Sequence, residues 1–314
     1  MAMIKHFADR LLDAIARKQA PVCAGLDPRL DWIPEEFYER AFDQYGRTPA
    51  AVRSAVRQFC CEVIDLVEPH VAALKPQAAF FEALGPEGSA DLGAVCEYGQ
   101  KKGLLIIADV KRGDIGTTAE AYAQSLFGGA RVKGIELPSL HADGATINPY
   151  LGGDSIVPFV ERATQTGGGL FILARTSNTG SAEFQELPLA EGGTLVERVA
   201  AQINTWGAQS IGTSGFSSVG AVVGATHLDA ARRMRELMPR ALFLVPGYGA
   251  QGGALETIRA CFNAEGRGAI VNSSRGVMHA YASGPLKDYG MGRWREAVAE
   301  AAKSLARDIS RLVA

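Results

Sequence analysis

One stretch of the sequence decides the fold, and it lies at residues 103–114, which read GLLIIADVKRGD. Its first half is an unbroken apolar run, which is typical of a parallel strand buried on both faces. Charged residues follow this run at once. A second run of the same kind, ALFLVPG at residues 241–247, ends at a proline and a glycine. Buried strands of this type predict an α/β protein with a parallel sheet.

Working outward from residues 103–114, apolar runs and helical periodicity alternate along the whole chain. Apolar residues recur at three- and four-residue steps over 52–67, 195–206, 228–237 and 294–312, which predicts amphipathic helices there. An additional helix at the N-terminus carries Phe7, Leu11 and Ile15 on one face. The predicted strands cover residues 22–27, 72–77, 104–109, 145–148, 170–175, 222–226, 242–245 and 269–272.

Parallel strands joined by helices form either an open doubly wound sheet or a closed (β/α)8 barrel. The predicted strands number eight, as a TIM barrel requires. The first strand is followed by GLDPRL at residues 25–30, which lacks the Gly-x-Gly-x-x-Gly turn of a dinucleotide-binding sheet. We therefore predict a single (β/α)8 barrel domain over residues 1–314, with an extra N-terminal helix.

The amino-acid composition limits the classes of binding partner and indicates a cellular compartment. The 32 basic and 34 acidic residues nearly balance, which argues against nucleic acid or an anionic membrane surface as the main partner. No apolar stretch of about 18 residues predicts a transmembrane helix, and the charged N-terminus does not resemble a secretory signal. The five cysteines are scattered without a C-x-x-C pair, which favours free thiols and a cytoplasmic protein.

Two longer stretches, residues 28–49 and 177–193, are predicted to be irregular. Each follows a predicted strand, so each is expected to lie over the C-terminal mouth of the barrel, which is the end where the strands finish. Barrel enzymes carry their active sites on the loops at this end.

Charged residues gather at these strand ends. Asp109 and Lys111 are two residues apart, so an extended backbone would point both side chains the same way. Gly113 permits a turn, after which Asp114 would place a second carboxylate beside Lys111. Lys75 ends the neighbouring strand and is positioned to contact Asp109. Such an array would fix ammonium groups without a metal. The alternatives are a solvated surface ion pair for the D-x-K-x-x-D pattern and, for Lys75, a lysine that extends its charged end to solvent.

The last two strands are followed by a predicted phosphate site. The sequence VPGYGAQGG at residues 245–253 supplies backbone N–H groups and the amide of Gln251. The sequence NSSRG at residues 272–276 supplies Arg275 and Gly276. Phosphate groups bind after the seventh and eighth strands of many barrels, and arginine offers a forked donor to the dianion. The alternative is two flexible loops with a surface arginine.

These residues together resemble a known family. The pattern D-x-K-x-x-D-I-G-x-T at residues 109–118 resembles the signature of the orotidine 5′-phosphate decarboxylases. The GLD around Asp27, the lysine ending the second strand and the two late loops are similar to that family as well. KPQAAFFE, INPYLGGDS and RTSNTGS, which begin at residues 75, 147 and 175, resemble its longer bacterial subgroup, type 2.

The resemblance implies an enzyme that converts orotidine 5′-monophosphate to uridine 5′-monophosphate and CO2, the last step of UMP synthesis, without a cofactor or a metal. Lys111 would donate the proton to the carbon that loses CO2, and Asp109 would lie beside the departing carboxylate. Lys75 would bridge a substrate hydroxyl and the charged residues. A homodimer is also implied, in which Asp114 and Thr118 reach the site from the partner subunit.

The resemblance also assigns the binding residues. Asp27 would bind the ribose hydroxyls and Ser177 the pyrimidine amide. The phosphate would be held by Gln251, Arg275 and Gly276. The sequence departs from shorter members, which often carry Glu-Met where Arg175 and Thr176 stand here. Whether Asn148 and Asp154 belong to the site stays open at this point.

Three other functions are alternatives to this one. A metal-dependent sugar-phosphate aldolase or decarboxylase of the same barrel group would turn Asp109 and Asp114 toward Mg²⁺, which the paired lysines disfavour. A non-catalytic phosphosugar-binding barrel is compatible with the fold alone. A nicotinamide-dependent oxidoreductase is disfavoured by the missing glycine fingerprint.

Overall fold

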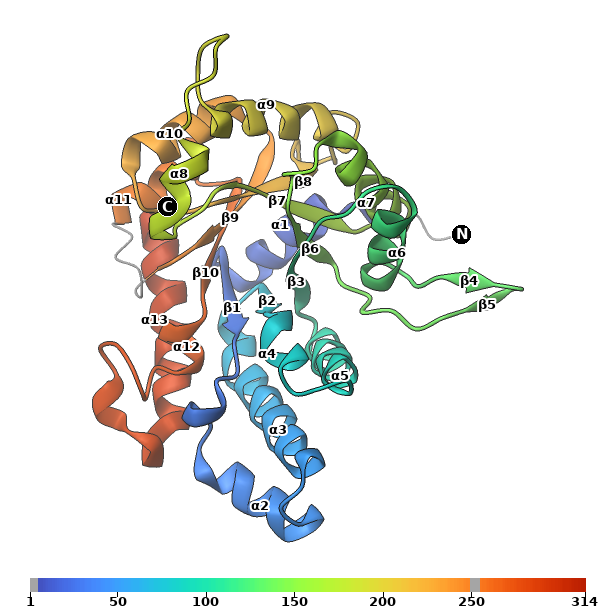
Figure 1. Cartoon of the computed structure of the whole chain (residues 1–314). Helices are drawn as coiled ribbons and strands as arrows, with labels where there is room; N and C mark the ends of the chain where they lie inside the picture. Colours follow the sequence, from blue (N-terminus) through green and yellow to red (C-terminus); the bar gives the residue numbers. More distant parts are fainter. Residues whose placement is uncertain (1–4, 249–254) are drawn as a thin grey trace.

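The computed structural model describes residues 5–248 and 255–314, and its centre is a closed barrel of eight parallel strands (Figure 1). Around the barrel the strands follow the order β1-β10-β9-β8-β7-β6-β3-β2. The predicted (β/α)8 barrel is therefore confirmed. The strand bounds are β1 Val22–Leu26, β2 Ala73–Pro76, β3 Leu105–Arg112, β6 Gly144–Ile147, β7 Gly169–Arg175, β8 Ser217–Val223, β9 Ala241–Pro246 and β10 Ala269–Ser273.

Helices connect the strands and pack on the outside of the barrel (Figure 1). The helices predicted over 52–67, 195–206, 228–237 and 294–312 correspond to α3, α9, α10 and α13. Within the part of the chain that the structure describes, no helix is both long enough and apolar enough to cross a membrane. The helix bounds are α1 Phe7–Lys18, α2 Glu35–Tyr45, α3 Pro49–Val67, α4 Ala78–Glu82, α5 Gly88–Lys101, α6 Gly116–Leu126, α7 Gly153–Thr166, α8 Ala182–Gln185, α9 Leu195–Gly207, α10 Leu228–Leu237, α11 Leu255–Ala260, α12 Arg275–Met278 and α13 Trp294–Val313.

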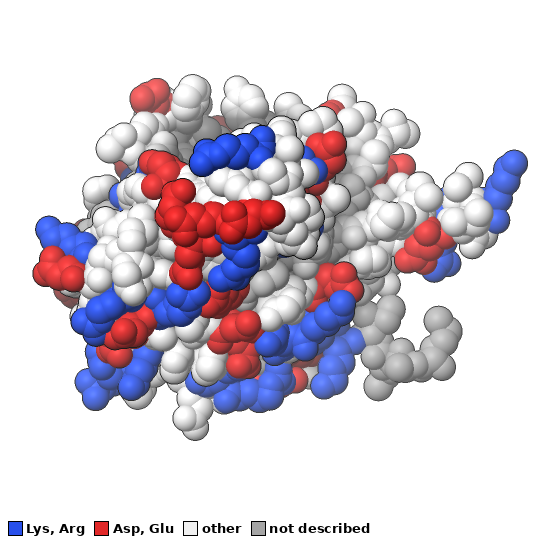
Figure 2. Space-filling model, turned by 90° about the horizontal axis from the view of Figure 1, so that it is seen from below, with Lys and Arg blue, Asp and Glu red and all other residues white. Residues whose placement is uncertain are grey.

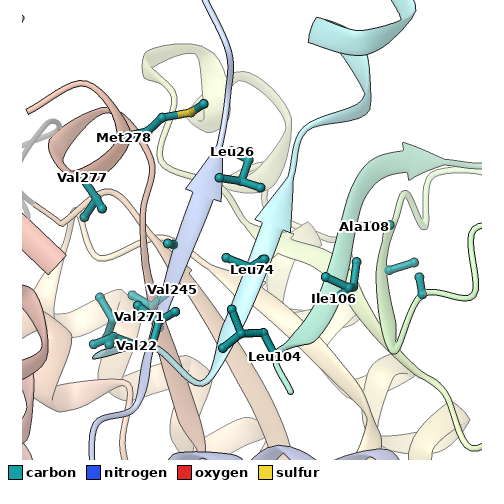
Figure 3. Packing of buried hydrophobic residues seen from close by; sticks show 14 of the residues in the cluster. Val22, Leu26, Leu74, Leu104, Ile106, Ala108, Val245, Val271, Val277 and Met278 are labelled. Carbon is teal, nitrogen blue, oxygen red and sulfur yellow. The ribbon is translucent and has the colours of Figure 1, made fainter. Parts of the chain in front are cut away.

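The hydrophobic core lies in two layers, because side chains alternate between the two faces of each strand. Leu26, Leu74 and Ile106 come from β1, β2 and β3 and belong to the outer layer, beneath the helices (Figure 3). All three are fully buried, and burial of one such side chain contributes about 1.5–3 kcal/mol. Phe171 and Leu244 belong to the inner layer, which fills the barrel. Both strand faces are apolar, and this explains the unbroken apolar runs.

The N-terminal helix α1 packs against the inner layer where the strands begin. The ring of Phe7 meets Phe171 edge to face, with 5.8 Å between the centroids. Gly169 makes room for it, since a Cβ there would lie 2.0 Å from Cδ1 of Phe7. The extra N-terminal helix thus covers one end of the barrel and leaves the C-terminal mouth as the end available for a site.

The stretch 28–49 is not irregular as predicted, because α2 occupies residues 35–45. Phe37 and Ala41 stand four residues apart and are buried, and Phe37 packs on Trp294 of α13 with 5.6 Å between the rings. Acidic residues on both sides of this pair and between its members hid the helical spacing. Glu35 and Glu36 lie in the first turn, where acidic side chains favour a helix.

Two strand predictions also differ from the structure, and the structure contains one further pair of strands. β8 begins at Ser217, five residues before the predicted start at 222, because serines open an otherwise apolar strand. β3 continues past the predicted end at 109 to Arg112. A short hairpin of β4 Arg131–Val132 and β5 Ile135–Glu136 was not predicted, and it projects from the body of the molecule (Figure 1).

Surface charges of both signs are interspersed on the face that Figure 2 shows, and no extended patch of one sign is visible there. This distribution agrees with the near balance of basic and acidic residues in the sequence.

Candidate active site

A cavity of about 900 Å³ opens at the C-terminal mouth of the barrel. Its wall is built from the ends of strands that are far apart in sequence, which is where barrel enzymes place their sites. The structure therefore brings together six of the residues singled out from the sequence. These six are Asp27, Lys75, Asp109, Lys111, Ser177 and Arg275.

Three of them form a continuous charged array, which we define as Lys75, Asp109 and Lys111. Oδ2 of Asp109 lies 2.5 Å from Nζ of Lys75, and Oδ1 lies 2.5 Å from Nζ of Lys111. The side chains of Lys75 and Asp109 are only 6% and 8% exposed, whereas that of Lys111 is 47% exposed. Lys75 and Asp109 are thus fixed in the wall, and Lys111 presents its ammonium to the cavity.

Two further side chains hold the carboxylate of Asp109, and sequence reasoning missed both. Nε2 of Gln77 donates to Oδ2 at 3.0 Å, and the hydroxyl of Thr146 donates to Oδ1 at 2.9 Å. With the two ammonium groups, these donors occupy all of the roughly four lone-pair directions of a carboxylate. The available signal was position, since each is a polar residue at the end of an apolar strand beside β3.

The backbone at Lys111 is not extended as predicted, because its φ is +46°. A non-glycine residue in this left-handed region costs about 1–2 kcal/mol. The register between β3 and β6 shifts between Ala108 and Arg112, so the irregularity lies around Lys111. The predicted meeting of Asp109 and Lys111 is present, although a turn rather than a straight strand produces it.

The charges of the array support one another. Burial alone would raise the pKa of Asp109, but Lys75 and Lys111 outweigh it and lower that pKa to about 2. Burial opposes the charge of Lys75, yet Asp109 and Asp27 raise the pKa of this lysine above its ordinary value. Both groups therefore stay ionised at neutral pH.

Asp27 follows β1 and faces the same cavity. Burial raises the pKa of this carboxyl above its usual value, and the nearby Lys75 only partly offsets the effect. Among the described residues, its Oδ1 atom is buried without a hydrogen-bond partner. A buried oxygen in this state is costly unless a donor reaches it. The position suits a ligand hydroxyl.

The structure describes only part of the predicted phosphate site. Arg275 begins α12 and lines the cavity, and no carboxylate within residues 5–248 and 255–314 pairs with it. Gly276 follows in a tight position, since a Cβ there would lie 2.9 Å from Oγ of Ser273. Gln251 lies outside the described residues.

Three of the predicted residues that the structure describes, Asp114, Thr118 and Gly276, do not line the cavity in this chain. Oδ1 of Asp114 accepts a hydrogen bond from the Ile115 backbone N–H at 2.8 Å, and Asp114 has no ion pair among the described side chains. Thr118 is exposed on α6. Among the described residues of its own chain, Lys111 is therefore paired with one carboxylate, and the second carboxylate stays a prediction that involves a partner subunit.

The loop of residues 177–193 lies over the mouth as predicted, although it contains the short helix α8. Gln185 bonds to both the backbone N–H and the hydroxyl of Thr176, at 3.0 and 2.7 Å. The buried Arg175 pairs with Glu186. Phe184 and Gln185 contribute to the cavity wall, as does Asn148, whereas Asp154 does not line it.

Within the described ranges, no group of three or more His, Cys, Asp or Glu side chains is arranged to hold a metal ion. The charged groups that line the cavity can act electrostatically. The cavity is lined by the ammonium of Lys111, by Asp27 with its unpaired Oδ1, and by Arg275, which has no ion pair among the described residues.

The sequence of this chain is similar to those of known proteins. The family model of the orotidine 5′-phosphate decarboxylase / HUMPS family matches residues 20–285. A curated orotidine 5′-phosphate decarboxylase from Rhodopirellula baltica is 42% identical over 275 residues, covering 88% of this chain and 89% of its own. One from Caldicellulosiruptor saccharolyticus is 38% identical over 305 residues, covering 97% of this chain and 98% of its own.

Solved structures agree with this placement. The Leishmania donovani OMP decarboxylase superposes with a TM-score of 0.73 at 32% identity, over 98% of both chains. The UMP synthase of the same organism gives a TM-score of 0.74 at 34% identity, over 98% of this chain and 57% of its own. The match of sequence and structure extends over nearly the whole chain, and the chain belongs to the orotidine 5′-phosphate decarboxylase / HUMPS family.

Proposed function

We propose that this protein decarboxylates orotidine 5′-monophosphate to uridine 5′-monophosphate and CO2, as the final step of UMP synthesis. The observation that carries the proposal is the ammonium of Lys111, which is held on Asp109 and exposed to the cavity. The names of the curated relatives support the substrate.

The chemical difficulty is the negative charge that decarboxylation leaves behind. The bond from the ring carbon to the carboxylate breaks, and its electron pair stays on a carbon without an adjacent π acceptor. Lys111 would stabilise this charge as it forms and then transfer a proton to the carbon. Neutral Lys111 would regain its proton from water after CO2 leaves. Preorganised charge of this kind is usually the largest catalytic contribution.

Asp109 would act through its position beside both lysines. Its two oxygens are committed to Lys75 and Lys111, so the ammonium of Lys111 is directed before substrate arrives. The same carboxylate would lie beside the departing carboxylate of the substrate. Lys75 would keep the buried Asp109 neutralised and bridge to a ribose hydroxyl. The low pKa of Asp109 supports a carboxylate that remains ionised throughout.

The remaining wall would bind the parts of the nucleotide that do not react. The unpaired Oδ1 of Asp27 is suited to a ribose hydroxyl, and Ser177 to the pyrimidine amide. Arg275 would take the phosphate together with Gly276 and Gln251. Binding energy from the phosphate can then be used to hold the ring against Lys111 and to close the loop of residues 177–193.

We further propose a cytoplasmic homodimer in which Asp114 and Thr118 complete the partner's site. Asp114 has no ion-pair partner among the described residues of its own chain, and the adjacent Ile115 is 54% exposed. A second copy would cover this apolar side chain and bring a second carboxylate to Lys111. All five cysteines are free thiols and four are buried, which is typical of a reducing compartment.

A metal-dependent aldolase or decarboxylase is not favoured by the geometry. A Mg²⁺ ion would need oxygen ligands, and the oxygens of Asp109 already accept from four donors. No observation in the described structure favours a non-catalytic barrel. An activity assay distinguishes that alternative from the proposed decarboxylase.

The direct experiment is an ultraviolet assay of orotidine 5′-monophosphate loss with purified protein, with and without EDTA. The proposal predicts stoichiometric formation of uridine 5′-monophosphate and CO2, at the same rate in both samples. Turnover that EDTA abolishes and Mg²⁺ restores would establish the metal-dependent alternative. Tight binding of uridine 5′-monophosphate without any product formation would establish the non-catalytic one.

A further inference from the structure

The hydroxyl of Thr146 lies at the centre of the hydrogen bonds around the charged array. Thr146 belongs to β6 and is only 1% exposed. Its oxygen donates to Oδ1 of Asp109 at 2.9 Å and accepts the backbone N–H groups of Val110 and Lys111, each at 3.0 Å. A hydroxyl has one donor and two acceptor directions, and all three are used here.

The two backbone groups that Thr146 accepts lie where β3 leaves its regular ladder. The β3–β6 register shifts between Ala108 and Arg112, and Lys111 has a φ of +46°. The Thr146 hydroxyl therefore satisfies two N–H groups at this irregularity. A left-handed, non-glycine residue persists only where the surroundings fix it. The hydrogen bond to the Lys111 N–H is such a constraint, and it comes from 35 residues further along the chain.

We propose that Thr146 is a positioning residue for the reaction. One oxygen atom ties the carboxylate of Asp109 to the backbone turn at Lys111, so that the carboxylate and the ammonium are oriented together. Thr146 would act through these two residues and not on the substrate itself. The inference rests on the proposed function, because it assigns a role in the chemistry that Lys111 performs.

A purely structural role makes a different prediction, and the chain offers a matched control. Ser217 of β8 is another buried hydroxyl, which donates to the Gly207 carbonyl and accepts the Val219 N–H, both at 3.0 Å. It lies at the start of its strand, whereas the cavity lies where the strands end. Ser217→Ala removes a comparable network without touching the charged array.

The experiment compares the kinetics and melting temperatures of Thr146→Val, Thr146→Ser and Ser217→Ala with those of the wild type. Valine keeps the shape but lacks the hydroxyl, so kcat is expected to fall about 10- to 100-fold, as a misplaced group does. KM and the affinity for uridine 5′-monophosphate stay within about threefold of wild type, because the groups that bind the nucleotide are unchanged. Thr146→Ser recovers most of kcat. Ser217→Ala melts at a lower temperature but keeps the wild-type kcat.

The proposal is overturned if Thr146→Val keeps the wild-type kcat, or if Ser217→Ala loses as much kcat as Thr146→Val. If the valine variant does not fold, the comparison moves to Thr146→Ser and Thr146→Cys. The serine variant should then approach wild type, with the thiol at least tenfold below it because sulfur is a weak donor and acceptor. Equal kcat values for the two would overturn the proposal.

A crystal structure of Thr146→Val separates this inference from the proposed function. A shift of Lys111 out of the left-handed region, with loss of its contact to Asp109, supports the positioning role even if the wild type does not turn over orotidine 5′-monophosphate. An unchanged φ and an unchanged contact refute the positioning role, even if wild-type turnover is confirmed.

Discussion

Oδ1 of Asp109 lies 2.5 Å from Nζ of Lys111, two positions further along the same strand. Lys111 has a left-handed φ of +46°, so this contact lies at an irregularity near the end of β3. The buried carboxylate thereby directs an ammonium that is itself half-exposed to the cavity.

The pH dependence of stability tests the burial of Asp109. Its pKa is about 2 in the folded protein against 3.8 in the unfolded chain, so its stabilising contribution is full above about pH 4. That contribution is lost as the pH falls from about 4 to about 2. Asp109→Asn lacks it and deprives the buried Lys75 of its ion-pair partner, which should cost about 3–5 kcal/mol at neutral pH.

Urea unfolding of both proteins between pH 7 and pH 2 checks this. The difference in unfolding free energy should shrink by about 2 kcal/mol as the pH falls from 4 to 2. Asp9, whose pKa is also about 2, is common to both proteins and cancels in the comparison. A difference that stays constant over this range would refute the assigned environment of Asp109.

Asp27→Asn tests whether the carboxylate of Asp27, whose Oδ1 is unpaired, binds a ligand. The pKa of Asp27 is raised by burial, so the folded protein binds its proton more tightly than the unfolded chain does. This group therefore favours folding most below its ordinary pKa and loses that benefit as the pH rises through its folded pKa. The asparagine variant should equal or exceed the wild type in unfolding free energy at pH 7.

The same variant should bind uridine 5′-monophosphate more weakly, by about tenfold or more, because a charged acceptor is lost. Calorimetric titration gives the affinity, and Asp229→Asn on exposed α10 serves as the control. Asp27 would have no binding role if the two variants showed the same affinity.

Arg275→Ala tests the phosphate end of the cavity. We expect kcat/KM for orotidine 5′-monophosphate to fall at least about 30-fold, the equivalent of roughly 2 kcal/mol, because a charged contact to the dianion is lost. The loss should be much smaller for orotidine, which has no phosphate. Arg293→Ala removes an exposed arginine paired with Glu296 and should leave both substrates unaffected. If Arg275→Ala lowers kcat/KM equally for orotidine 5′-monophosphate and orotidine, Arg275 does not contact the phosphate.

Mixing two inactive variants tests whether Asp114 acts across a dimer interface. Lys111→Ala and Asp114→Ala are each expected to have little activity. In a mixed dimer, one site receives Lys111 from one chain and Asp114 from the other and is intact. Random pairing makes about half of the dimers mixed, so activity should return to about one quarter of wild type.

This recovery is measured after the two chains are unfolded together and refolded, with each variant refolded alone as the control. If Asp114 serves the site of its own chain, no intact site can form in any mixture. The absence of recovery in a sample that sedimentation shows to be dimeric would therefore contradict the partner-subunit role.

The sequence predicted those features that depend on strand order and strand ends. Buried parallel strands read as apolar runs, so the barrel and the approach of Lys75 to Asp109 could be inferred from residues 72–77 and 104–109. The turn at Lys111 could not, because Thr146, which holds it, lies on β6 and local sequence does not reveal that contact. The role of Gln77 was hidden in the same way.

Other misses have equally specific causes. Helix α2 was overlooked because acidic residues surround its buried pair, Phe37 and Ala41. The start of β8 was placed too late because Ser217 and Ser218 are polar although both are buried. The position of Asp114 beside Lys111 of a partner subunit stays a prediction, because one chain alone does not test it.

The central claim is that the Lys111 ammonium stabilises and protonates the carbanion, and the most direct measurement is kcat of Lys111→Ala. The account predicts a loss of at least about 10³-fold, while uridine 5′-monophosphate still binds and the melting temperature stays close to that of wild type. Arg112→Ala, which alters the neighbouring residue and its pairing with Glu82, is the matched control. A Lys111→Ala protein that turns over orotidine 5′-monophosphate with a kcat near that of wild type would contradict the account.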